Sequence, residues 1–173
     1  MLNEGTEQLL QTFHPNIIKE SIEVIEQDPT IKAEHKIWLL ARLITPEAFA
    51  TLENKVDQAL KTIDEDWPNI PLKIPTTKYK RTILQWCFEI GLAEKAHSII
   101  KKGGNPFLLT TNLESCLHLA CISGDKATIK LALSLDLSKK KKNLANKSPL
   151  DLLKLFHPMD KKLIAFVESI DHE

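Results

Sequence analysis

The chain has 173 residues, of which 43% are hydrophobic and 27% charged, with 23 basic and 23 acidic side chains. This composition is typical of a globular protein with one or two domains, and no stretch approaches the roughly 18 uninterrupted apolar residues that a membrane span needs. The acidic start, Met1 to Glu7, lacks the basic-then-apolar form of a secretory signal, so we expect a cytoplasmic protein.

Residues 1–66 are expected to form an N-terminal helical bundle. Pro15, Pro29 and Pro46 each fall where a helix can begin, because proline tolerates the first helical position. A short helix is expected near residues 3–12, and three segments with helical apolar spacing follow it. Their apolar faces are Ile18, Ile22 and Ile25, then Ile37, Leu40, Ala41 and Ile44, then Phe49, Leu52, Val56, Ala59 and Ile63.

Residues 67–76 hold three prolines in ten positions and are expected to be an extended, fairly stiff connector without a helix. Its apolar side chains, Ile70, Leu72 and Ile74, could pack along the segment that follows.

Residues 77–173 contain one pattern three times at a spacing of 33 residues, with units starting near 77, 110 and 143. Each copy opens on a hydroxyl residue and carries, three positions later, a side chain that can bond back to the chain. That arrangement is a capping box, which starts a helix. The pairs are Thr82 with Gln85, Ser115 with His118, and Ser148 with Asp151.

Each unit is expected to be a pair of helices. Leu84, Leu117 and Leu150 should point inward, and Gly91 and Gly124 should end the first helices in a left-handed conformation. The second helices are expected over residues 93–102, 127–135 and about 160–170. The third unit has His157 in place of glycine, and its last helix should have a polar outer face, as in a terminal repeat, with Lys161, Lys162, Glu168 and Asp171.

The 33-residue period and the cores similar to T-P-L-H-x-A resemble the ankyrin repeat, over about residues 77–170. The resemblance implies an all-α protein, an N-terminal helical bundle followed by a short ankyrin-like helical solenoid. The bundle would then cover the open flank of the first unit, and it could also bind a partner of its own. One further alternative is an F-box-like domain over residues 9–52 of a ubiquitin-ligase adaptor, although Phe13-His14-Pro15 replaces the Leu-Pro opening expected there.

Ankyrin-repeat proteins usually bind another protein, without catalysis, in the concave face formed by the turn tips and the ends of the first helices. The resemblance therefore implies a monomeric interaction module or adaptor, and it suggests an effector that intracellular bacteria deliver into the host cytosol. Lys80 and Leu113 stand where the family usually has glycine, and only Asn146 should adopt the left-handed conformation cheaply. The implied partner contacts are Lys78, Tyr79, Arg81, Glu89, Ile90, Thr111, Asn112, Glu114, Ile122, Ser123 and Lys147.

The sequence contains no phosphate-binding glycine loop, G-x-S-x-G elbow or H-E-x-x-H motif, so we expect no enzyme and no cofactor. The nearest approach to a metal or nucleophile cluster is Cys116, His118 and Cys121. Their spacing spreads them around one helix and no second ligand pair is present, so we expect buried core residues and no metal site.

Charge divides the chain, because residues 1–66 carry 6 basic and 13 acidic side chains and residues 67–173 carry 17 and 10. The two parts could attract each other across their junction, or the basic part could meet an acidic partner. The run Lys139, Lys140, Lys141 and Lys142 is expected in a loop, either simply solvated or in contact with an anionic ligand. Nucleic acid is the less favoured partner, because no aromatic residues interrupt the run.

Overall fold

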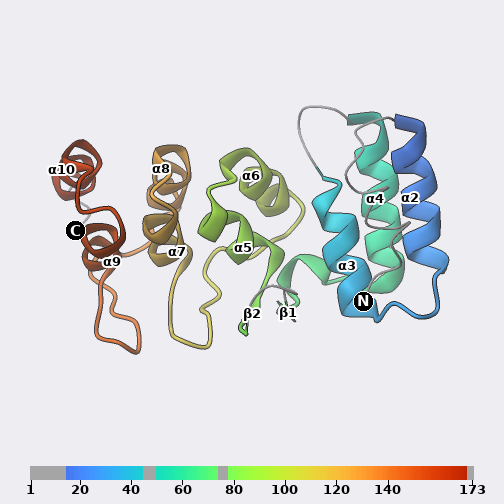
Figure 1. The fold of residues 1–173 in the computed structure, drawn as a ribbon, viewed down its shortest axis with the longest axis horizontal. Helices are drawn as coiled ribbons and strands as arrows, with labels where there is room; N and C mark the ends of the chain where they lie inside the picture. The colour runs from blue at the N-terminus through green and yellow to red at the C-terminus, as the bar shows by residue number, and fades with distance from the viewer. Residues whose placement is uncertain (1–14, 45–49, 74–77, 171–173) are drawn as a thin grey trace.

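The computed structural model describes residues 15–44, 50–73 and 78–170, and within them the protein is mostly helical (Figure 1). Nine α-helices occur in this part of the chain: α2 (Pro15–Gln27), α3 (Ala33–Arg42), α4 (Ala50–Ile63), α5 (Ile83–Ile90), α6 (Ala93–Lys101), α7 (Cys116–Ser123), α8 (Lys126–Ser134), α9 (Pro149–Phe156) and α10 (Lys161–Ser169). None of these helices combines the length and the apolar character needed to cross a bilayer.

The expectation of an all-α protein is confirmed at the level of a mostly helical fold, to which two short strands in antiparallel register are added. These are β1 (Leu72–Lys73) and β2 (Lys80–Arg81), with Leu72 opposite Arg81. The expected helix at 3–12 lies outside the described residues, as do the side chains of Ile18, Phe49, Ile74 and Asp171 and the helix start at Pro46.

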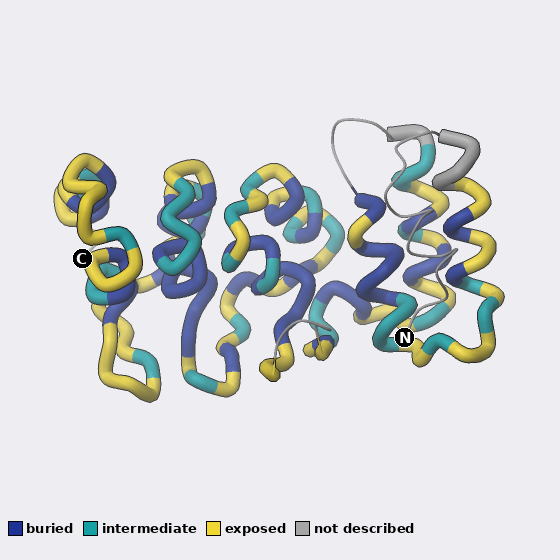
Figure 2. Tube along the Cα trace, viewed as in Figure 1, coloured by how far each residue is buried: buried dark blue, intermediate teal, exposed yellow. Residues whose placement is uncertain are grey.

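Helices α2, α3 and α4 pack against one another as the expected bundle, in which Ile22, Ile25, Leu40 and Val56 are buried. Each of these side chains belongs to an apolar face that the helical spacing predicted. Burial runs without a break from this bundle into the first helices that follow (Figure 2). The chain therefore has one continuous apolar core over its described length.

The segment after the bundle differs from the expected connector, because Trp67–Asn69 forms a 3-10 turn. Pro68 is the second residue of this turn, and proline in the first turn of a helix lacks only an N–H that would be unpaired anyway, so it does not prevent the turn. Asp64 receives the backbone N–H of Asp66 at 2.9 Å, and burial of the Trp67 ring holds the turn in the core. The ring's burial outweighs the preference of a proline-rich segment for an extended chain.

Residues 83–169 form three helix pairs that stand in a row, α5 with α6, α7 with α8, and α9 with α10 (Figure 1). The first helices α5, α7 and α9 pack side by side, and α6 packs against α8. Leu84 and Leu117 are fully buried, whereas Leu150 is half-buried. The second helices agree with the expected ranges to within one residue at most ends.

All three predicted capping boxes are present, which confirms the helix starts. In the first box, the Gln85 N–H donates to Thr82 Oγ1 at 3.1 Å and the Thr82 N–H donates to Gln85 Oε1 at 3.0 Å. Gly91 and Gly124 end α5 and α7 with φ of 79° and 71°, as predicted. These local interactions bring the chain back to an equivalent position in each unit.

Candidate functional site

Tight turns precede α7 and α9, and we call them tips 2 and 3. Residues 78–81, before α5, are tip 1, and their strand β2 pairs with β1. Tip 2 is closed by the Thr110 N–H donating to the Glu114 carbonyl at 3.0 Å, and tip 3 by the Asn143 N–H donating to the Lys147 carbonyl at 3.0 Å. The Leu144 N–H donates to the Asn112 carbonyl at 2.9 Å, so tips 2 and 3 are joined through their backbones.

The left-handed position of tips 2 and 3 is occupied by residues other than glycine. Leu113 and Asn146 occupy the same place in tips 2 and 3 and have φ of 58° and 56°. The sequence predicts that only Asn146 adopts this conformation cheaply, and Leu113 adopts it as well, at a cost in backbone strain. The Thr110 hydroxyl accepts the N–H groups of Asn112 and Glu114 at 3.2 and 3.1 Å, which holds Leu113 in a conformation that costs about 1 to 2 kcal/mol.

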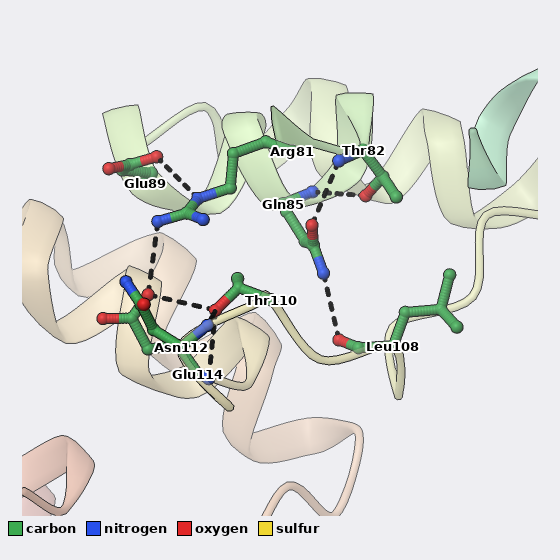
Figure 3. A network of polar contacts seen from close by, with 8 residues as sticks. All are labelled: Arg81, Thr82, Gln85, Glu89, Leu108, Thr110, Asn112 and Glu114. Carbon is green, nitrogen blue, oxygen red and sulfur yellow. Dashed lines mark hydrogen bonds and ion pairs between the residues drawn. The ribbon is translucent and has the colours of Figure 1, made fainter. Parts of the chain in front are cut away.

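Arg81 lies inside the molecule, in contrast to the exposed tip position expected for it. Its side chain is 5% exposed and forms ion pairs with Glu89, at 3.3 Å from Nε to Oε2, and with Glu114, at 3.2 Å from Nη2 to Oε2 (Figure 3). Glu114 is also buried and receives the Thr110 hydroxyl at 3.2 Å. The expectation that Arg81 and Glu114 offer exposed contacts is corrected, since both stabilise the contact between successive units.

The Arg81 network shows that a tip and the end of a first helix share one face. Arg81 leaves tip 1 and reaches Glu89 in the last turn of α5, while the Tyr79 ring centre lies 5.6 Å from its Cζ atom. Tip residues and helix-end residues of one unit therefore lie close together. The 33-residue register extends the same face to the next two units.

The remaining predicted contacts lie at or near the surface. The exposed ones are Lys78, Tyr79, Ile90, Thr111 and Lys147, and the half-buried ones are Glu89, Asn112, Ile122 and Ser123. None of the nine is deep in the core, so each is compatible with the expected contact surface.

Sequence reasoning missed the apolar end of this face in the third unit. Leu155 and Phe156 end α9 and are 62% and 53% exposed. They lie 33 residues beyond Ile122 and Ser123, so the repeat spacing carried to the third unit was the signal that could have found them. We call the resulting surface the candidate face, and it consists of Tyr79, Glu89, Ile90, Asn112, Ile122, Leu155 and Phe156.

The C-terminal helix pair is more apolar at its surface than expected. Lys161, Lys162 and Glu168 are exposed on α10, as predicted for a terminal unit. Met159 in the preceding turn is also exposed, and it adds to the apolar surface of Leu155 and Phe156.

Two members of the lysine run are tied to the last helix pair. Lys139 Nζ donates to the Val167 carbonyl at 3.2 Å, and Lys142 Nζ pairs with Asp151 Oδ2 at 2.9 Å. Lys140 and Lys141 are exposed. The lysine run is thus a loop beside tip 3 in which two lysines contact the last helix pair and two add positive charge to the surface.

Cys116, His118 and Cys121 are buried, as predicted. Burial raises the pKa of each thiol to about 12, so both cysteines are neutral at pH 7. His118 Nδ1 accepts the Ser115 N–H at 3.1 Å, and its Nε2 lies 3.2 Å from the Lys147 carbonyl. The histidine therefore joins α7 to tip 3, and burial holds its pKa below the ordinary value.

The opposite charges of the two parts of the chain meet between α4 and α6, as one of the two interpretations predicted. Lys102, the residue directly after α6, pairs with Glu53 on α4, and its Nζ lies 4.0 Å from Asp57 Oδ2. The Ser98 hydroxyl also donates to Glu53, at 2.9 Å. These contacts line an open depression of about 570 Å³ with mixed charge, and they fix the bundle against the first helix pair.

Within the described residues, no group of three or more histidine, cysteine or acidic side chains could hold a metal ion. A scan against protein-family models gave no match to this chain, and a search of the curated proteins also gave none.

Proposed function

We propose that residues 77–170 are an ankyrin-like solenoid and that the protein is a non-catalytic interaction module, which binds another protein through the candidate face. The proposal rests on one observation, that apolar side chains lie exposed or half-buried at the ends of the first helices of the three successive units. Ile90, Ile122, Leu155 and Phe156 follow one another along the ends of α5, α7 and α9. A row of this kind, with a spacing set by the repeat, is a surface that an apolar segment of a partner could cover.

The charge around the candidate face supports a partner with acidic groups. Lys78, Lys80 and Lys147 are exposed in the tips, and Lys140 and Lys141 are exposed beside tip 3. Acidic side chains of a partner would be attracted to this edge while its apolar side chains pack on the helix ends. Binding should therefore weaken as salt concentration rises, because the charges are exposed.

The proposal can be tested with substitutions on the candidate face. The purified protein and its Ile90→Ser and Phe156→Ser variants would be used to capture proteins from a eukaryotic lysate, with identification by mass spectrometry. Val24→Ser is the matched control, because Val24 is similarly exposed but lies on α2, in the bundle. We expect a protein captured by the wild type and by Val24→Ser, and lost or weakened with both candidate-face variants.

Calorimetry with the captured protein would then give the loss in affinity. Loss of an apolar contact near the centre of an interface should weaken binding by more than about 1 kcal/mol, or about fivefold in Kd. Equal affinity of wild type, Ile90→Ser and Phe156→Ser, with circular dichroism showing all three folded, would place the interaction elsewhere on the molecule.

A further inference from the structure

Two cationic side chains and two tryptophans meet where the bundle contacts the first helix pair. The Cζ atom of Arg42, on α3, lies 4.7 Å from the ring centre of Trp38, and the Nζ atom of Lys95, on α6, lies 5.7 Å from that of Trp86. The two indole rings pack edge to face with centres 6.3 Å apart. We call these four residues the indole cluster.

The indole cluster contains hydrogen-bond donors without acceptors. Lys95 is 6% exposed, yet within the described part of the chain its ammonium group has neither an ion pair nor a hydrogen bond, and the same holds for Arg42. Trp38 is 8% exposed, and its buried Nε1 has no hydrogen-bond partner among the described residues. Lysine, arginine and indole N–H groups only donate, so a ligand that suits this cluster is a hydrogen-bond acceptor.

Among the described residues, no side chain supplies a negative charge to Lys95. Burial raises the pKa of the adjacent Cys87 thiol to about 12, so that thiol is neutral at pH 7. Burial also lowers the pKa of Lys95 to about 8, and the charge of Arg42 acts in the same direction, which leaves most of the ammonium protonated at pH 7.

An uncompensated cation in this position is costly. Removing most of an ammonium group from water carries a large free-energy penalty, and contact with an aromatic face returns only part of that penalty. The two tryptophans therefore offset part of the penalty. A counter-ion between Lys95 and Arg42 would offset the remainder, and the guanidinium of Arg42 is suited to a planar or tetrahedral oxyanion.

We propose that the indole cluster is a binding site for an oxyanion, a carboxylate or phosphate group, with Lys95 and Arg42 as its charged contacts. The site is separate from the candidate face and does not depend on the proposed interaction with a partner protein. A group bound there would connect α3 to α6, and it would hold the bundle and the first helix pair together.

Tryptophan fluorescence offers a direct test, because Trp38 and Trp86 are two of the three tryptophans in the chain. Inorganic phosphate and acetate would be titrated separately into the full-length protein at constant ionic strength. We expect a saturable change with at least one of them, and a rise in thermal midpoint at the saturating concentration. Lys95→Met should weaken this binding about tenfold or more. Lys101→Met, at an exposed lysine of the same helix, should bind like the wild type.

The two titrations distinguish the sources of the anion. A response to phosphate alone indicates a phosphate-bearing ligand, and a response to acetate alone indicates a carboxylate; either result supports the site. Arg42→Gln, a substitution at an exposed position, is the second variant and should also bind several-fold more weakly even if Lys95→Met does not fold. The proposal is overturned if the folded wild type shows no saturable response to either anion, or if both variants respond as the wild type does.

Discussion

The strongest test of the structure is the buried pair of Arg81 and Glu114, because burial makes the effect of a substitution large. Arg81→Met would leave Glu114 buried, with the Thr110 hydroxyl as its remaining side-chain contact. Breaking a buried ion pair from one side costs about 3 to 5 kcal/mol, because an unpaired charge stays in the interior. We expect Arg81→Met to lower the free energy of unfolding by about 3 kcal/mol. Glu114→Leu should lower it by less, because Glu89 still offsets the charge of Arg81 in that variant.

Combining the two substitutions should recover most of the lost stability. In the Arg81→Met, Glu114→Leu double variant no buried charge remains between tips 1 and 2, and apolar side chains of similar size fill the space. Glu89 loses its ion pair with Arg81, but it is half-buried and its carboxylate can be solvated. Replacing both partners of a buried pair is often nearly neutral, so the double variant should lie within about 1 kcal/mol of the wild type.

Urea unfolding followed by circular dichroism would supply the four free energies of unfolding in this cycle. A loss below about 0.5 kcal/mol for Arg81→Met would show that its side chain is solvated, as surface ion pairs are worth that little. Strictly additive single losses in the double variant would also refute the pairing, because residues that do not interact show no coupling.

Three further changes probe local features. Leu113→Gly should raise the free energy of urea unfolding by about 1 kcal/mol or less. Glycine removes the strain of the left-handed conformation in the folded state, and this gain exceeds the conformational entropy that glycine adds to the unfolded chain. Leu92→Asp should add about 1 kcal/mol in the same assay, because the equivalent Asp160 caps α10 with nearly the same backbone angles while α6 has no side-chain cap. Burial lowers the pKa of His118, so the unfolded chain takes up the proton first and stability should fall as pH drops below 6.5. His118→Gln places in the second capping box the residue type that Gln85 supplies in the first. This variant should flatten the dependence of stability on pH between about pH 7.5 and 5, and an unchanged dependence would contradict the role given to buried His118.

The elements that the sequence predicted well depend on contacts a few residues apart. A capping box joins positions three residues apart, and a left-handed glycine ends a helix through bonds within one turn. For this reason the helix starts at Thr82, Ser115 and Ser148 and the ends at Gly91 and Gly124 agree with the structure. The apolar spacing of α2 to α4 succeeded for the same reason, since one helix face collects residues three and four apart.

Burial of polar residues could not be predicted in this way, because it depends on segments far apart in the chain. Arg81 was expected at an exposed tip and is enclosed by Glu114, 33 residues later, while the carboxylate of Glu53 reaches Lys102 from another part of the fold. In the sequence Lys95 is indistinguishable from an exposed helical lysine, whereas in the structure it is buried and contacts Trp86 of α5. The sequence by itself determined where the helices begin, end and repeat, through local hydrogen bonds and spacing. Only the tertiary structure decided which charges are buried and which apolar side chains stay exposed, because both depend on what the neighbouring helix places against them.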